Sequence, residues 1–136
     1  MANIDEVTYE LLTKENVHLI YTALEKLDES DELEIDPERL RDFLEYPQNL
    51  AFIAQYQGEV CGLIYGYSLM SLTEGPQLFV YSVDVLNRFQ NRGIGSKLFQ
   101  YVVDYGRANG YSECFVITDK GNQRACRVYE KAGGKK

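Results

Sequence analysis

The stretch Gln90-Asn91-Arg92-Gly93-Ile94-Gly95-Ser96-Lys97 joins an apolar run to the start of an amphipathic helix pattern. The start of a helix exposes unpaired backbone N–H groups and the positive end of the helix dipole, so it favours an anion. The glycines at 93 and 95 remove side chains that would keep a pyrophosphate away from those N–H groups. The stretch therefore predicts a site for a phosphate-bearing ligand, and the alternative is a glycine-rich turn needed only for tight packing.

Two other phosphate-binding motifs do not fit this stretch. Its Gly-x-Gly pair does not continue as Gly-x-Gly-x-x-Gly, because residue 98 is Leu, and this argues against a dinucleotide-binding fold. No Gly-Lys-Ser or Gly-Lys-Thr occurs in the chain either, which argues against a P-loop.

Outward from this stretch, the apolar residues follow strand and helix periods in turn. We expect strands over residues 7–13, 50–56, 60–69, 78–86 and 112–118. We expect helices over residues 17–27, 36–44, 94–109 and 122–132. This order predicts a single α/β domain over residues 1–136, in which helices pack on both faces of a sheet.

Short local signals mark some of the expected boundaries. Asp36-Pro37 is typical of a helix N-cap followed by proline at the first helical position. Gln57-Gly58 indicates the turn of a hairpin, and Asn109-Gly110 suits the left-handed end of a helix.

The charges are divided unevenly along the chain. Residues 1–87 carry 17 Asp and Glu against 4 Lys and Arg, a sum of -13, and residues 88–136 carry 4 against 10, a sum of +6. One end of the molecule should attract cations and the other anions, unless the charges cluster by chance. The overall charge of -7 argues against a nucleic-acid partner, because the molecule would repel phosphate.

Composition narrows the class of protein further. No run of eighteen apolar residues occurs, and no basic region followed by an apolar stretch opens the chain. We therefore expect a cytoplasmic protein without a membrane span. The only histidine, His18, is interpreted as a solvated helix residue, and no metal site is expected because no Cys-x-x-Cys pair accompanies it. Cys61 and Cys114 lie in apolar runs and are interpreted as buried, reduced thiols, and Cys126 as a bystander.

Residues 90–95 are similar to the Gln/Arg-x-x-Gly-x-Gly/Ala motif of the GNAT superfamily of N-acetyltransferases, which lies between the fourth strand and the third helix. The second signature of that superfamily, Asn-x-x-Ala-x-x-x-Tyr-x-x-x-Gly, is matched by Asn122, Ala125, Tyr129 and Gly133. Two motifs in this order are far more specific than either alone. The resemblance covers residues 50–133 well. It implies a mixed, mostly antiparallel sheet with a V-shaped split between its fourth and fifth strands.

The resemblance also implies acetyl-CoA as co-substrate and assigns residues to it. The backbone amides of the first motif would bind the pyrophosphate of coenzyme A. The strand before the motif would pair with the pantetheine arm. The residues so implied are Val83, Val85, Gln90, Asn91, Arg92, Gly93, Ile94, Gly95, Ser96, Asn122 and Tyr129.

Acetyl transfer from a thioester to an amine needs three groups. The amine must lose a proton, the developing oxyanion must be stabilised, and the leaving thiolate must be protonated. The resemblance assigns the last role to Tyr129. It assigns the oxyanion donor to a backbone N–H near Val85, where GNAT strands carry a bulge that opens the sheet.

The sequence offers two candidates for the base that accepts the amine proton. Asp84 should share one face of its strand with Ser82, and Asp84 is the better base, directly or through one water. Its alternative role is a structural ion pair with Arg88. Glu74, in the loop before the strand, is the reserve candidate.

Within the superfamily, residues 79–85 (Phe-Val-Tyr-Ser-Val-Asp-Val) look most like aminoglycoside 3-N-acetyltransferases. Aminoglycosides are polycations, in agreement with the acidic sum of residues 1–87. Those enzymes carry Tyr-Asp where this chain has Tyr81-Ser82, so the acidic residue at that position is absent here. The alternatives are acetylation of a polyamine, a peptide N-terminus or another small cationic amine, and an acetyl-CoA-binding module without transferase activity.

The chain ends at Lys136, just past the last expected helix, whereas GNAT domains continue into one or two more strands. Residues 112–118 would then form an open sheet edge, which is prone to pair with another chain. We therefore expect missing C-terminal strands, and either a homodimer or a truncated chain.

Overall fold

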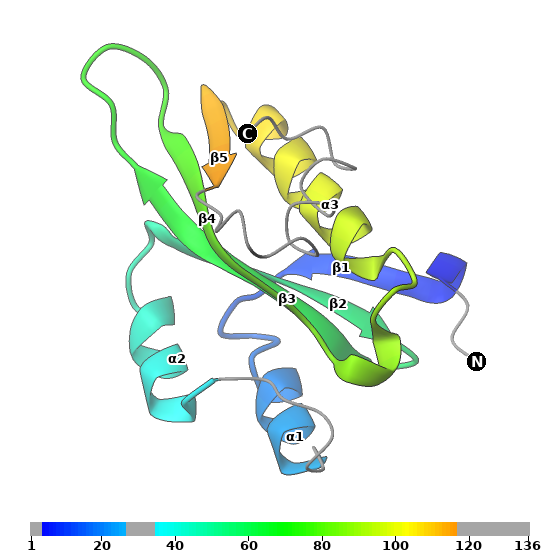
Figure 1. Cartoon of the computed structure of the whole chain (residues 1–136). Helices are drawn as coiled ribbons and strands as arrows, with labels where there is room; N and C mark the ends of the chain where they lie inside the picture. Colours follow the sequence, from blue (N-terminus) through cyan, green and yellow to red (C-terminus); the bar gives the residue numbers. More distant parts are fainter. Residues whose placement is uncertain (1–3, 27–34, 117–136) are drawn as a thin grey trace.

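The computed structural model describes residues 4–26 and 35–116, which form a five-stranded mixed sheet with helices (Figure 1). The strand order is β1-β2-β3-β4-β5; β1 to β4 pair antiparallel, and β5 runs parallel to β4. The strands are β1 (Val7–Leu11), β2 (Asn49–Tyr56), β3 (Glu59–Leu69), β4 (Gln77–Val85) and β5 (Glu113–Val116). The helices are α1 (His18–Lys26), α2 (Pro37–Leu44) and α3 (Ile94–Ala108), with 3-10 turns at Ile4–Glu6 and Asn87–Phe89. The mixed α/β fold predicted from the sequence is confirmed, and the helix expected over 122–132 lies outside the described residues.

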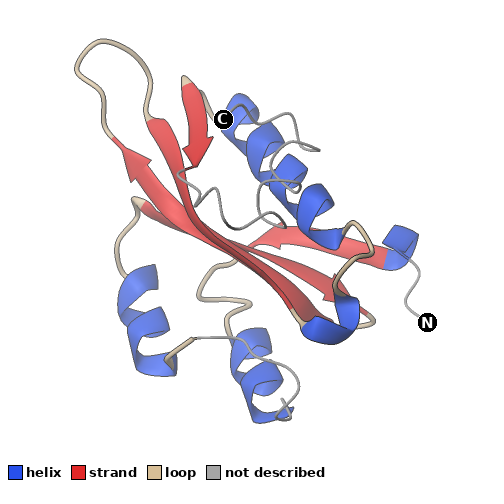
Figure 2. Ribbon diagram, viewed as in Figure 1, coloured by secondary structure: helices blue, strands red, loops and turns tan. Residues whose placement is uncertain are grey.

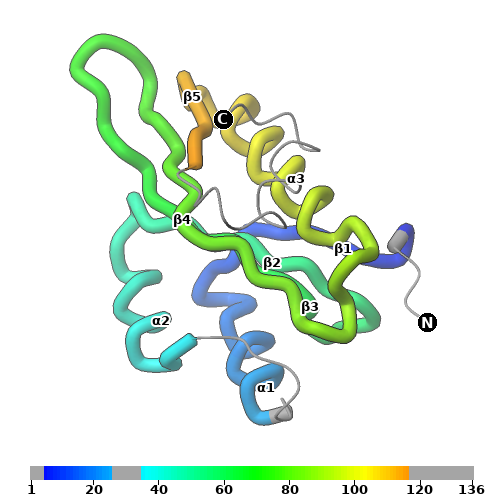
Figure 3. The backbone as a smooth tube through the Cα atoms, in the orientation of Figure 1, coloured from blue at the N-terminus to red at the C-terminus, as the bar shows by residue number. Residues whose placement is uncertain are grey.

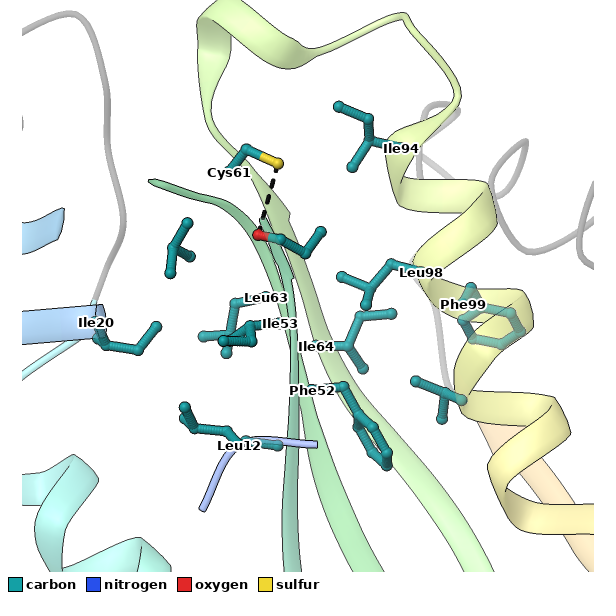
Figure 4. Packing of buried hydrophobic residues seen from close by; sticks show 14 of the residues in the cluster. Leu12, Ile20, Phe52, Ile53, Cys61, Leu63, Ile64, Ile94, Leu98 and Phe99 are labelled. Carbon is teal, nitrogen blue, oxygen red and sulfur yellow. Dashed lines mark hydrogen bonds between the residues drawn. The ribbon is translucent and has the colours of Figure 1, made fainter. Parts of the chain in front are cut away.

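The sheet lies between two helical layers. Helices α1 and α2 cover one face and α3 covers the other (Figure 2), and the β3–β4 connection extends beyond the end of the sheet (Figure 3). Buried apolar side chains fill both interfaces: Ile20 and Leu63 lie on the α1 side, and Phe52, Ile64 and Leu98 on the α3 side (Figure 4). In the described residues, no helix is long and apolar enough to cross a membrane.

Two boundaries follow the local signals in the sequence. Asp36 caps α2, because its carboxylate accepts a 3.0 Å hydrogen bond from the Glu38 N–H, and Pro37 opens the helix. Gln57 and Gly58 have φ values of 51° and 79°, and such left-handed pairs suit the tight turn of a hairpin. Both predictions are confirmed.

One residue of β4 has no partner on β3. Tyr65 pairs with Ser82, and the next residue, Gly66, pairs with Val80. Tyr81 is therefore the extra residue of a β-bulge, which bends its strand and increases the local twist.

Gly66 explains the position of this bulge. A Cβ atom built on Gly66 would lie 2.1 Å from the Phe79 carbonyl oxygen, so only glycine admits the close approach of β4. The prediction of a bulge near Val85 is wrong in position, because Val85 pairs with Gly62 in the regular register.

In the described part of the chain, β5 pairs with only the first half of β4. Residues Gln77 to Val80 of β4 pair with Glu113 to Val116, where the described part of β5 ends. From Tyr81 onward, the edge of β4 that faces away from β3 has no strand beside it among the described residues. The V-shaped split expected between the fourth and fifth strands falls where β5 would continue past residue 116, outside the described residues, so it stays a prediction.

Candidate active site

The β4–α3 loop is tied to the end of β4 by a side chain. The Gln90 side-chain amide donates to the Val85 carbonyl oxygen (2.8 Å) and to Oδ1 of Asn87 (3.0 Å). Asn91 and Gly93 have left-handed backbones, with φ values of 63° and 83°, and Gly93 is the N-cap of α3. Gln90 therefore shapes the loop through its side chain, a role that the motif did not reveal.

The N-terminus of α3 lacks a side-chain cap. Gly93 has no side chain to accept a hydrogen bond, and the first bond of the helix runs from the Lys97 N–H to the Gly93 carbonyl oxygen at 3.0 Å. The N–H groups of Ile94, Gly95 and Ser96 precede this bond and so have no partner within the helix. Together with the helix dipole, they suit this end of α3 to a phosphate group.

Three basic residues, Arg88, Arg92 and Lys97, lie in or beside this loop. The guanidinium of Arg88 lies 3.3 Å from the carboxylate of Glu59, and the ammonium of Lys97 lies 3.9 Å from that of Asp5. Arg92 is half-buried and makes no ion pair within the described part of the chain. The positive charge best placed to meet a ligand at the loop is therefore that of Arg92.

The open edge of β4 carries backbone hydrogen-bonding groups. The Leu86 N–H donates to the Cys61 carbonyl oxygen of β3 at 3.0 Å. Because strand residues alternate, the N–H and C=O groups of Val85 and Val83 point away from β3, toward the side on which β5 pairs with the first half of β4. This edge leads directly into the loop and the uncapped start of α3 (Figure 1).

A carboxylate and a hydroxyl share the opposite side of β4. The Ser82 hydroxyl donates to Oδ2 of Asp84 at 3.4 Å, so the prediction that they lie on one face is confirmed. This is the face covered by α1 and α2. Burial raises the pKa of the neighbouring Tyr65, and repulsion from Tyr67 and Tyr81 in their ionised forms and from the Asp84 carboxylate raises it further. A phenol there stays protonated at neutral pH.

Six aromatic rings follow one another on the same face. The ring centroids of Tyr65 and Tyr81 are 5.4 Å apart, and those of Phe43 and Tyr65 are 5.6 Å apart. Tyr81 is 58% exposed at the bulge. Tyr65 and Tyr67 were not among the predicted site residues, although their spacing of two residues was the signal that they share one face. The complete cluster is Phe43, Tyr65, Tyr67, Phe79, Tyr81 and Phe115.

Glu74, the reserve candidate for the base, lies before the opposite end of β4. It is exposed in the β3–β4 loop, where its N–H donates to the Ser71 hydroxyl at 3.3 Å. The strand from Gln77 to Asp84 spans about 23 Å at 3.3 Å per residue. The structure therefore does not bring Glu74 to the Ser82–Asp84 pair.

The other candidates are placed as follows. Cys61 is a buried free thiol and Cys114 a half-buried one, and burial raises the pKa of each to about 11. His18 is exposed at the start of α1. Across residues 4–26 and 35–116, no cluster of three His, Cys, Asp or Glu could hold a metal ion. Three candidates lie outside the described residues: Asn122, Cys126 and Tyr129.

Comparison with protein families gives one match. The model of the acetyltransferase (GNAT) family matches residues 15–134, which includes both motifs and every element from α1 to β5. No protein of curated function matches the chain in sequence.

Solved structures with the same fold include several acetyltransferases. An aminoglycoside acetyltransferase from an uncultured soil metagenomic sample, in complex with sisomicin, has a TM-score of 0.77 at 21% identity, over 98% of this chain and 93% of that one. AAC(6')-Iy with the bisubstrate analog CoA-S-monomethyl-acetylneamine has a TM-score of 0.74 at 20% identity, over 96% and 91%. A ribosomal-protein-alanine N-acetyltransferase from Brucella melitensis has a TM-score of 0.74 at 18% identity, over 96% and 92%. At these identities the likeness establishes the fold alone.

Proposed function

Because the chain belongs to the acetyltransferase (GNAT) family, we propose that it transfers the acetyl group of acetyl-CoA to a primary amine of a cationic small molecule. It is an N-acetyltransferase and uses acetyl-CoA; the acceptor is the proposed part. Aminoglycosides are the first class to test, because residues 79–85 resemble the 3-N enzymes and the solved structures named above include a 6' enzyme. Polyamines and peptide amines are the alternatives.

The observation that carries the proposal is the edge of β4 after Val80, which has no neighbouring strand in residues 4–26 and 35–116 and leads into the uncapped start of α3. The N–H groups of Ile94, Gly95 and Ser96 would bind the pyrophosphate, and Arg92 would add a positive charge beside it. Val85 would hold the pantetheine arm as an added strand would be held. The residues present therefore fit coenzyme A.

The position of the bulge indicates which backbone N–H group would stabilise the oxyanion. Acetyl-CoA supplies the activated acetyl group, and the chain must stabilise the acetyl oxygen as it gains negative charge. Val83 carries the first N–H group after the bulge at Tyr81 that faces away from β3. We therefore assign the donor to Val83, two residues before the predicted Val85.

Asp84 is the proposed acceptor of the amine proton, directly or through one water. The exposed ring of Tyr81 and the ring of Tyr65 lie on the same face, and aromatic faces attract ammonium groups. Asp84→Asn should lower kcat by about 10²-fold and leave the KM for acetyl-CoA near the parent value. Asp104→Asn, the same change on the exposed face of α3, is the matched control. An equal loss in both variants would remove Asp84 from this role.

Tyr129 is the proposed acid that protonates the leaving thiolate. It lies outside the described residues, so the proposal rests on its position in the second motif. Tyr129→Phe removes only the hydroxyl. It should lower kcat while acetyl-CoA still raises the melting temperature, and unchanged turnover would contradict the assignment.

The acceptor is tested by coenzyme A release from acetyl-CoA with gentamicin, kanamycin, spermidine and a basic peptide. Turnover on the aminoglycosides alone, with the acetylated amino group located by NMR of the product, would support the aminoglycoside proposal and decide between the 3 and 6' positions. Turnover on spermidine alone, or on the peptide alone, would make that class of amine the acceptor in place of aminoglycosides. Acetyl-CoA binding without turnover on any amine would contradict the proposed transfer.

We also propose a homodimer formed through β5. Its inner edge pairs with β4, and within the described residues no strand lies on its outer edge. Open strand edges pair readily with another chain. Light scattering should give twice the monomer mass at micromolar concentration; a monomer with full activity would contradict this proposal.

A further inference from the structure

A cavity of about 340 Å³ lies between α2 and the sheet. Its floor is formed by Ala51 of β2 and by alternate residues of β3, and its roof by the inner side of α2. Ligand pockets in proteins have volumes of about 300–1,000 Å³ and are lined mostly by apolar and aromatic side chains. The lining residues are Ile35, Asp36, Arg39, Leu40, Phe43, Ala51, Leu63, Tyr65 and Tyr67.

The cavity adjoins the Ser82–Asp84 pair. Leu63 and Tyr65, which line it, are the cross-strand partners of Asp84 and Ser82. Paired residues of neighbouring strands lie on the same face, and the strands are about 4.8 Å apart. A molecule whose amine lies at Asp84 can therefore extend directly into the cavity.

The charged groups of the lining are already engaged with each other and with the helix. Asp36 accepts the Glu38 N–H at 3.0 Å as the cap of α2, and its other oxygen lies 3.9 Å from Nε of Arg39. The Arg39 side chain is 88% exposed at the rim. The interior thus offers apolar and aromatic surface. A second ammonium buried there would lose its hydration without a free carboxylate to replace it, whereas an apolar group would gain.

We infer that the acceptor is an amphipathic primary amine, with its ammonium beside Asp84 and an apolar or aromatic substituent in the cavity under α2. The inference rests on the proposed acetyl transfer and narrows its acceptor class. Phe43, Tyr65 and Tyr67 set the shape of the cavity, because edge-to-face contacts of Phe43 with the two tyrosines (5.6 and 5.8 Å between centroids) hold the rings in place. Ala51, the smallest lining side chain, determines how large a substituent fits.

The first test compares amines on the parent protein. Coenzyme A release is measured with ethylamine, 2-phenylethylamine and gentamicin. The value of kcat/KM should rise by about tenfold or more from ethylamine to 2-phenylethylamine, since a filled apolar pocket discriminates by at least that factor. Equal values for the two monoamines, with faster turnover of gentamicin, would overturn the inference and leave the proposed transfer intact. No transfer to any amine would overturn both.

The second test fills the cavity with Ala51→Leu. The KM for 2-phenylethylamine should rise by about tenfold, and the KM for ethylamine should stay near the parent value. Ala23→Leu is the matched control: Ala23 is half-buried and lines a separate hollow of about 50 Å³ under α1. Melting curves should show that both variants fold. An equal change in the two KM values, or the same change in Ala23→Leu, would overturn the assignment of the cavity.

Discussion

The substitution Gly66→Ala tests the origin of the bulge in β4. A Cβ atom at position 66 would lie 2.1 Å from the Phe79 carbonyl oxygen and 3.0 Å from the Cα of Val80, both backbone atoms, and real Cβ contacts stay above 3.0 Å. The two strands must therefore separate by about 0.9 Å at this point. Strain of this kind costs roughly 1–3 kcal/mol of unfolding free energy, which corresponds to a fall in melting temperature on the order of 10 °C.

Gly62→Ala is the control for this change. It lies in the same strand, and its new Cβ would meet the Asp84 carbonyl oxygen at 3.4 Å and the side chains of Ala54 and Leu98 at 3.6 Å, which are ordinary contacts. This variant should melt at or slightly above the parent temperature, because alanine restricts the unfolded chain by roughly 0.4–1 kcal/mol.

Thermal unfolding followed by circular dichroism, together with coenzyme A release, measures both effects. Gly66→Ala should lose stability and also kcat, because the bulge directs the open edge of β4, whereas Gly62→Ala should keep both. If Gly66→Ala melts at the parent temperature and turns over at the parent rate, Gly66 does not determine the position of the bulge.

Three further changes test other parts of the structure. The Tyr9 hydroxyl is buried without a hydrogen-bond partner in the described residues, so Tyr9→Phe should raise the unfolding free energy by roughly 1 kcal/mol. If urea denaturation instead gives a lower unfolding free energy for Tyr9→Phe, the hydroxyl forms a hydrogen bond in the parent protein. Burial raises the pKa of Cys61 from 9.0 to about 11. The contribution of the protonated Cys61 thiol to the unfolding free energy should therefore be fully present below pH 9 and be lost between pH 9 and 11. Cys61→Ala should weaken that decline, and an unchanged decline would assign it to other groups. Arg92→Ala should raise the KM for acetyl-CoA by about tenfold through loss of a charged phosphate contact, with Glu59→Gln as the control at the paired Arg88; equal effects would contradict the assignment.

The predictions that held were those set by neighbours in the chain. Asp36-Pro37 fixes the start of α2, because a cap and a proline act within one turn. The glycines at 93 and 95 place the start of α3 for the same reason. The shared face of Ser82 and Asp84 follows from strand alternation over two residues.

The features that the sequence did not reveal depend on contacts between distant segments. The bulge lies at Tyr81 because β3 presents glycine to the Phe79 carbonyl, and nothing in β4 itself shows which residue of β3 it meets. The cavity under α2 combines one helix with two strands, so no single stretch contains it. The structural role of Gln90 depends on where β4 ends, since its amide bonds the last carbonyl of the strand.

The extra residue at Tyr81 reverses which side chains of β4 face which side of the sheet. Before it, even-numbered side chains such as Leu78 lie toward α3; after it, odd-numbered ones such as Val83 take that direction. A chimera that joins half of this strand to half of a related strand therefore keeps each side chain on its present face only if the joined strand carries one such residue, neither none nor two. Deleting Tyr81 would turn every side chain on one side of the junction to the wrong face, although no residue beyond it had changed.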